Sequence, residues 1–140
     1  MKLGSSPELT YLLDSNACIR LINNSSPTVI SRLAAQQPSD ILVSTITQLE
    51  LYYGAYRSAQ RDRNLEILQR FFIQFNIIHL DSEAAIQAGK IRADLAALGT
   101  PIGPYDVQIA AIALANDLIL VTHNVREFNR VDGLQIEDWE

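Results

Sequence analysis

The sequence predicts an α/β fold, a three-layer α/β/α sandwich built on a mainly parallel sheet of four to five strands. Short, continuous apolar runs alternate along the chain with longer segments whose apolar residues recur at helical spacing. Strands that are apolar on both faces are typical of parallel sheets covered by helices on each side. Acidic residues close to the ends of these runs complete the pattern, because such sheets bind ligands beyond the carboxyl ends of their strands.

Each apolar run is a predicted strand, and each periodic segment is a predicted helix. The expected strands are residues 10–13, 41–43, 76–80 and 118–121, with residues 134–136 as an additional edge strand. The expected helices are residues 17–22, 27–35, 46–56, 62–75, 82–98 and 105–114, with a single turn at 125–128. With no repeat, low-complexity tract or linker, residues 1–140 are expected to form one domain, with residues 1–8 as a loose lead-in.

Two of the helices have apolar stripes that predict which side faces the core. The stripes consist of Ile46, Leu49, Tyr53 and Tyr56 in the first helix, and of Ala84, Ala88, Ile91, Leu95 and Leu98 in the second. Gly99 is the expected end of the second helix. Glu50 lies beside the first stripe, so we expect this carboxylate to have a partner.

The composition limits the function and the compartment. A net charge of −5 argues against a general nucleic-acid-binding protein, because phosphate groups bind to lysine and arginine. Several arginines are nevertheless concentrated in one short segment: Arg57, Arg61, Arg63 and Arg70. Cys18 is the only cysteine, so no intrachain disulfide can form, and no apolar run approaches the length of a membrane span. These features predict a cytoplasmic protein.

Four acidic residues from distant parts of the sequence are expected at one edge of the sheet. Asp14 follows the first strand, Glu50 lies in the helix after the second, Asp106 opens the helix before the fourth, and Glu127 follows that strand. Two carboxylates about 4 Å apart repel each other by about 4 kcal/mol at an effective dielectric constant near 20. Oxygen-preferring Mg²⁺ or Mn²⁺ would relieve this repulsion, and the chain has no Cys/His set for zinc.

Each acid also has a simpler interpretation. Asp14 and Asp106 could cap the helices that follow them, and Glu127 could be an ordinary surface acid. His79 and His123 are expected to serve packing or hydrogen bonding rather than metal binding. The functional interpretation therefore depends on whether folding brings the acids together.

Several segments, in this order, resemble the PIN-domain ribonucleases, specifically the VapC toxins of bacterial toxin–antitoxin pairs. The segments that carry the resemblance are YLLDSN at residues 11–16, ELYYG at 50–54, PIGPYD at 101–106, VTHN at 121–124, REF at 126–128 and IEDW at 136–139. Each motif alone is weak, but the ordered set covers nearly the whole chain.

The resemblance implies a PIN-like fold and a Mg²⁺- or Mn²⁺-dependent endoribonuclease that is neutralised by a VapB antitoxin and is commonly a homodimer. It implies tRNA, and more narrowly initiator tRNA, as the substrate. Asp14, Glu50 and Asp106 match the family's invariant acids and are the expected metal ligands. Asn124 stands where many PIN domains have a fourth aspartate, and Glu127 is the expected replacement in the catalytic set, so the number of metal ions stays open.

Further residues are expected to support this chemistry. Attack by metal-activated water would leave 5′-phosphate and 3′-hydroxyl ends. The expected supporting residues around the acids are Asn16, Ser44, Thr122 and Asn124, and the expected RNA-binding residues are Arg57, Arg61, Lys90 and Arg92. Tyr52, Tyr53 and Tyr56 could stack on bases, but we favour core packing or a dimer contact.

Two other classes of protein remain as alternatives. One is a non-catalytic PIN-fold protein that binds RNA or a partner. The other is a phospho-acceptor signalling module, which also places an aspartate after a strand but needs a lysine near the last strands. The only lysines are Lys2 and Lys90, so this second alternative is disfavoured.

Overall fold

The structure is a computed structural model that describes residues 10–140. Its strands are β1 (Tyr11–Leu13), β2 (Ile41–Ser44), β3 (Asn76–Ile78), β4 (Ile119–Val121) and β5 (Gln135–Glu137). Its helices are α1 (Ser15–Ile22), α2 (Pro27–Ala34), α3 (Thr45–Arg57), α4 (Arg61–Phe72), α5 (Ser82–Ala97), α6 (Pro104–Ala115) and α7 (Val125–Phe128), with a short 3-10 helix at Pro38–Asp40. The predicted lead-in at residues 1–8 lies outside the described residues.

The strands form one sheet in the order β3-β2-β1-β4-β5, and every neighbouring pair is parallel. The predicted α/β sandwich is therefore confirmed, with the edge strand at residues 134–136 present as β5 and shifted by one residue. The chain runs outward from β1 to β3 and then resumes at β4 on the other side of β1. β1 and β4 are adjacent, but the chain leaves them toward opposite edges of the sheet. Two neighbouring strands of this kind leave a crevice at their carboxyl ends, where ligands bind in open α/β sheets.

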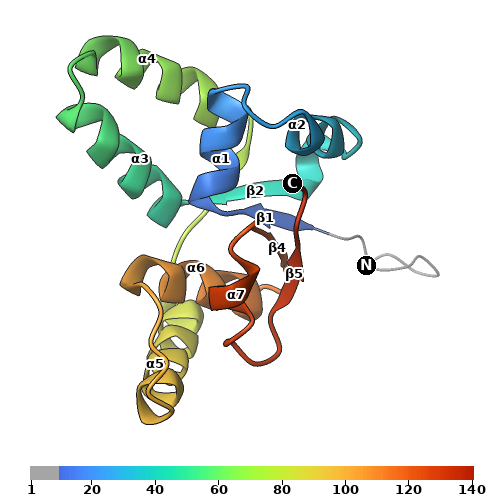
Figure 1. Cartoon of the computed structure of the whole chain (residues 1–140), viewed down its shortest axis with the longest axis vertical. Helices are drawn as coiled ribbons and strands as arrows, with labels where there is room; N and C mark the ends of the chain where they lie inside the picture. Colours follow the sequence, from blue (N-terminus) through green and yellow to red (C-terminus); the bar gives the residue numbers. More distant parts are fainter. Residues whose placement is uncertain (1–9) are drawn as a thin grey trace.

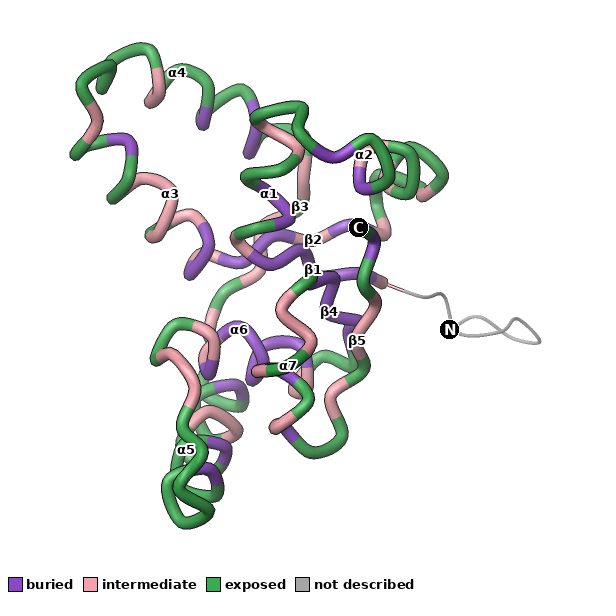
Figure 2. The backbone as a smooth tube through the Cα atoms, in the orientation of Figure 1, coloured by how far each residue is buried: buried purple, intermediate pink, exposed green. Residues whose placement is uncertain are grey.

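Helices cover both faces of the sheet because β1 is apolar at every position. Leu12 packs into a core with α5 and α6, whereas Tyr11 and Leu13 pack into a second core with residues of α1, α2 and α4. In Figure 1, α1–α4 lie above the sheet and α5–α7 below it. The central strands and α6 are the most continuously buried parts of the backbone (Figure 2).

The predicted stripe of α3 is wrong for three of its four members. Ile46 is buried, but Leu49, Tyr53 and Tyr56 are 49%, 60% and 62% exposed. The core contacts of α3 are made instead by the face that carries Ala55, with Tyr52 half-buried against Phe72 of α4 at a ring-centroid distance of 5.6 Å. The position of α4 decides which face is covered, and helical spacing alone does not reveal it.

Two helix ends also differ from the prediction. α4 ends at Phe72, so Phe75 belongs to the turn before β3, and β3 ends at Ile78 instead of residue 80. Leu98 is 74% exposed, contrary to its predicted inward position, because α5 ends at Ala97 and Leu98 is its C-cap. Gly99 follows with a φ of +70°, the left-handed conformation that ends helices, as predicted. Across residues 10–140, every helix is too short or too polar to cross a bilayer.

Candidate active site

Asp14 is buried at the carboxyl end of the central strand. Its backbone N–H donates to the Val121 carbonyl at 3.1 Å, which extends the pairing of β1 with β4 by one residue. Its Oδ1 accepts a hydrogen bond from the Ala17 N–H at 2.7 Å, so Asp14 does cap α1. Burial raises the pKa of Asp14, although the Thr122 hydroxyl and the Ala17 N–H stabilise its charged form. Capping uses one carboxylate oxygen and leaves the second for another partner.

Glu50 lies on α3, but its carboxylate is held by α1. The Ser15 hydroxyl donates to Glu50 Oε1 at 2.7 Å, and the same Ser15 Oγ lies 3.0 Å from the Thr47 hydroxyl oxygen. Thr47 is fully buried and precedes Glu50 by three residues, which places both side chains on one face of α3. The partner predicted for Glu50 is therefore a serine hydroxyl.

Asp106 lies in the first turn of α6, and it does not cap this helix. The N-cap is Gly103, and within residues 10–140 no backbone N–H donates to the Asp106 carboxylate. A Cβ atom at Gly103 would lie 3.2 Å from Asp106 Oδ2, so the glycine leaves room for the carboxylate against the backbone. Burial, followed by the negative charge of Glu127, raises the pKa of Asp106 to about 6. This carboxylate is therefore placed where its charge is unfavourable.

Glu127 is half-buried on α7 and belongs to a chain of hydrogen bonds. Asn124 Nδ2 donates to Glu127 Oε2 at 2.7 Å, and the Asn124 N–H donates to Thr122 Oγ1 at 2.9 Å. Thr122 in turn stabilises the charged form of Asp14. Asn124 and Thr122 therefore connect the carboxylates of Asp14 and Glu127, and an isolated surface acid would have no such partners.

The structure brings the four acids to one edge of the sheet, and we call Asp14, Glu50, Asp106 and Glu127 the acid site. The negative charges of Glu127, Glu50 and Asp14 all raise the pKa of Asp106, which requires that they lie near it. Asp14 directly follows β1, Glu50 lies in the second turn of α3, and Asp106 and Glu127 lie in the first turns of α6 and α7. A set of carboxylates with no thiolate or imidazole among them suits Mg²⁺ or Mn²⁺, and their mutual repulsion is what such a cation would relieve.

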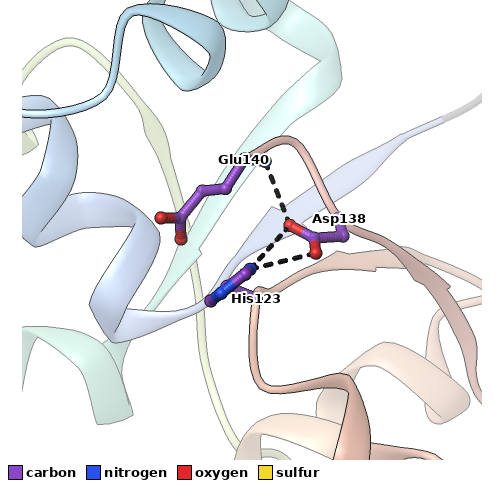
Figure 3. A group of neighbouring side chains, drawn as sticks. All are labelled: His123, Asp138 and Glu140. Atoms are coloured by element: carbon purple, nitrogen blue, oxygen red, sulfur yellow. Dashed lines mark hydrogen bonds and ion pairs between the residues drawn. The ribbon is translucent and has the colours of Figure 1, made fainter.

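A second group of possible metal ligands lies beside the acid site. His123, Asp138 and Glu140 each offer a ligand atom, and these atoms lie within 4.8 Å of one another, the only such trio among residues 10–140 (Figure 3). His123 Nδ1 is 3.0 Å from Asp138 Oδ2, and Glu140 Oε1 pairs with Arg20 Nε at 3.2 Å. These contacts agree with the hydrogen-bonding role predicted for His123. Among the described residues, no three carboxylates of the acid site come this close together.

The predicted supporting residues differ in what they contact. Thr122 and Asn124 contact the acid site, as described above. Ser44 is fully buried and caps α3 by accepting a hydrogen bond from the Thr47 N–H at 3.1 Å, so it fixes the start of the helix that carries Glu50. Asn16 is exposed on α1.

The predicted RNA-binding residues do not form one patch. Arg57 ends α3 and Arg61 begins α4, whereas Lys90 and Arg92 lie on α5, across the sheet (Figure 1). Arg57 stacks on the Tyr53 ring with a guanidinium-to-centroid distance of 5.6 Å, and Lys90 pairs with Asp94 at 2.8 Å.

Sequence reasoning missed three residues around the acid site. Ser15 and Gly103 belong to the motifs at residues 11–16 and 101–106, but neither has a role predicted from the sequence. Glu140 raises the pKa of Asp14 through its charge. Its position follows from Trp139, which is buried edge-on against Tyr11 at a centroid distance of 5.2 Å and fixes the end of the chain. This contact depends on tertiary structure and has no local sequence signal.

Comparisons with known proteins agree with this geometry. The PIN domain family model matches residues 11–134. A tRNA(fMet)-specific endonuclease VapC from Salmonella typhimurium is 44% identical over 131 residues, which cover 94% of this chain and 98% of that protein. The protein of the same name from Shigella flexneri is 42% identical over 131 residues, which again cover 94% of this chain and 98% of that protein.

Solved structures give the same result. The DNA-bound VapBC complex from Salmonella typhimurium contains a chain that is 42% identical, with a TM-score of 0.89 over 95% of this chain and all of that one. VapBC2 from Rickettsia felis, bound to a promoter DNA fragment, contains a chain that is 30% identical. Its TM-score is 0.85, and the match covers 94% of this chain and all of that one. The chain therefore belongs to the PIN domain family and, within it, to the VapC proteins.

Proposed function

We propose that this chain is the endoribonuclease toxin of a toxin–antitoxin pair. The observation that carries the proposal is the acid site itself, in which four carboxylates from separate elements meet at the carboxyl edge of a parallel sheet. Such crowding destabilises the folded protein unless a cation binds there, so it has a functional explanation and no evident structural one. The printed names of the VapC relatives, endonuclease and ribonuclease, support the same reaction.

The substrate we propose is tRNA, and more narrowly initiator tRNA. The support is the 44% identity with a relative named as a tRNA(fMet)-specific endonuclease. The acid site repels phosphate until a cation binds, so RNA binding must use basic residues outside it. Arg57 and Arg61 on one side, and Lys90 and Arg92 on the other, are the candidates.

The cofactor we propose is Mg²⁺ or Mn²⁺, held by Asp14 and Asp106 with Glu50 as a direct or water-mediated ligand. When bound, such an ion lowers the pKa of water and stabilises charge on the phosphate and the leaving oxygen. Thr122 partly offsets the effect of burial on Asp14 by stabilising its charged form. Ser15 holds the Glu50 carboxylate, which orients the attacking water. Asn124 holds the carboxylate of Glu127 with a hydrogen bond. The products are a 5′-phosphate and a 3′-hydroxyl, because the ribose 2′-hydroxyl takes no part.

The partner we propose is a VapB-type antitoxin, supported by the VapBC complexes that resemble this chain. We also propose a homodimer. Leu49, Tyr53 and Tyr56 form an exposed apolar row on α3, consistent with the dimer contact expected for the tyrosines.

The test is cleavage of purified tRNA by the wild-type protein and by Asp106→Asn, with Mg²⁺ or Mn²⁺ present. The wild-type protein should produce discrete fragments, and the new 5′ end of each downstream fragment should carry a phosphate that allows its ligation to an adaptor. Addition of EDTA should stop the reaction. Asp106→Asn is nearly isosteric, so the variant should fold. Loss of a residue that only supports a metal ligand lowers activity by roughly 10- to 100-fold, and we expect a larger loss here because Asp106 is itself a proposed ligand. Full activity in this variant would remove Asp106 from the site, and 2′,3′-cyclic phosphate ends would exclude the proposed reaction.

Glu83→Gln is the matched control. Glu83 is an exposed acid in the first turn of α5, away from the acid site and the candidate RNA-binding residues, so its neutralisation should leave cleavage unchanged. A protein that binds tRNA without cutting it, in the presence of either metal, would be the non-catalytic PIN-fold protein instead.

A further inference from the structure

Three polar side chains form a continuous hydrogen-bonded chain between α1 and α3. The distances are 3.0 Å from Thr47 Oγ1 to Ser15 Oγ and 2.7 Å from Ser15 Oγ to Glu50 Oε1. An ionised carboxylate can only accept hydrogen bonds, so the single Ser15 proton points to Glu50. The hydrogen between the two hydroxyls must then come from Thr47. The direction of every hydrogen bond in the chain is therefore fixed.

We infer that Ser15 is a positioning residue for Glu50, an inference that rests on the proposed function of the acid site. The short hydrogen bond to a charged acceptor is of the stronger class, and it comes from the residue next to Asp14. A free glutamate side chain occupies several rotamers, whereas this one is held at one oxygen and keeps the other available. Ser15 thereby couples the position of the Glu50 carboxylate to that of Asp14, across two helices.

The burial of Thr47 supports this role. Its hydroxyl is completely inaccessible, so it needs a protein partner, and Ser15 Oγ is that partner. The sequence places a hydroxyl residue at position 15, between the two helices, and it places Thr47 one helical turn before Glu50. A serine that only began α1 would need neither contact, because Asp14 already provides the cap.

The test compares Ser15→Ala with Ser15→Thr in tRNA cleavage under steady-state conditions with Mn²⁺. Ser15→Ala should lower kcat by roughly 10- to 100-fold, the range found when support of a site residue is removed, with KM changed less than about twofold. Ser15→Thr keeps the hydroxyl and should restore most of kcat. An unchanged kcat in Ser15→Ala, a loss confined to KM, or equal losses in both variants would each overturn the inference.

A second readout does not depend on activity. A crystal structure of metal-free Ser15→Ala should show the Glu50 side chain in more than one rotamer, whereas the wild-type protein should show one. A single, unmoved Glu50 rotamer in Ser15→Ala would contradict the positioning role. Ser26→Ala is the matched control, because Ser26 is a buried serine that caps α2 and whose side chain hydrogen-bonds only Thr28 and Val29 among the described residues. It should lower stability and leave kcat unchanged.

Glu50→Gln separates this inference from the proposed function. If Glu50→Gln cleaves RNA as fast as the wild-type protein, the catalytic role of Glu50 is wrong, and the role of Ser15 falls with it. If Glu50→Gln is inactive while Ser15→Ala is fully active, the proposed function stands and only the inference about Ser15 is overturned.

Discussion

The half-buried carboxylate of Asp106 lies close to the carboxylate of Glu127, and burial together with this neighbouring negative charge raises the pKa of Asp106. Two carboxyl groups can share a hydrogen bond only when one is protonated, which burial of Asp106 also favours. Together these effects bring the pKa of Asp106 to about 6, so it takes up a proton well above the pH at which an exposed aspartate does.

Without metal, the protein should become more stable as the pH falls from 7.5 to 5.5. The pKa of Asp106 is higher in the folded state (about 6) than the ordinary value of 3.8, so between these values the folded state binds more protons. Its contribution to stability therefore falls as pH rises from about 4 to about 6 and stays low above that. Because Asp106 is only half-buried, water screens the effect, and we expect a rise in Tm of about 2 °C at the lower pH. Thermal unfolding in EDTA at both pH values measures it.

Asp106→Asn is the control for this pH dependence. The neutral amide cannot titrate, so the difference between pH 7.5 and pH 5.5 should shrink, and the variant should be at least as stable as the wild-type protein at pH 7.5. An undiminished pH effect in Asp106→Asn would assign it to other groups.

Added Mg²⁺ or Mn²⁺ should stabilise the folded protein at pH 7.5. A ligand that binds only the folded state at 100 times its dissociation constant contributes about 2.7 kcal/mol. Asp14→Asn and Asp106→Asn should lose most of the response, whereas His123→Ala should keep it. If His123→Ala abolishes the response and the aspartate variants retain it, the cation binds His123, Asp138 and Glu140 instead of the acid site.

Gly103→Ala should reduce cleavage while leaving the fold intact. The added Cβ would lie 3.2 Å from Asp106 Oδ2, so the carboxylate must move by a few tenths of an ångström. We expect a loss of roughly 10-fold in kcat, at the lower end of the range for misplaced site residues. Gly54→Ala is the control, since a Cβ there meets no atom within 4 Å. Gly54 lies inside α3, so alanine should stabilise the protein by about 0.5 to 1 kcal/mol without loss of activity. Equal activity in both variants would contradict the prediction.

Replacing Arg57 and Arg61 together by alanine should weaken RNA binding and make it less dependent on salt. Each arginine that contacts a phosphate releases about one counterion, so the slope of log K against log salt concentration should fall by about 1 per lost contact. Binding of uncleaved tRNA to the Asp106→Asn protein, measured at several salt concentrations, gives this slope. Arg70→Ala is the control, because Arg70 is paired with Glu66 at 2.6 Å. An unchanged slope in the double variant would move the RNA-binding surface elsewhere.

Much of the fold could be predicted from the sequence because its signals are local. The run at residues 11–13 is apolar at every position, which predicts a strand covered on both faces, and Gly99 marks the end of α5 by its own backbone conformation. The acids of the site were found in the same way. Asp14 follows a strand directly, and strands of a parallel sheet end at one edge, so the topology alone predicts that acids placed there converge.

What the tertiary structure decided is which side chains contact one another. Periodicity predicted that Leu49, Tyr53 and Tyr56 face the core, but the place of α4 leaves them exposed. Ser15 became a partner of Glu50 because α1 and α3 pack side by side, and Glu140 reached Asp14 because Trp139 is buried against Tyr11. Sequence patterns record how each segment divides between apolar and polar faces. Contacts between residues 35 or more positions apart depend on how those segments pack, and a single sequence carries no local signal for that.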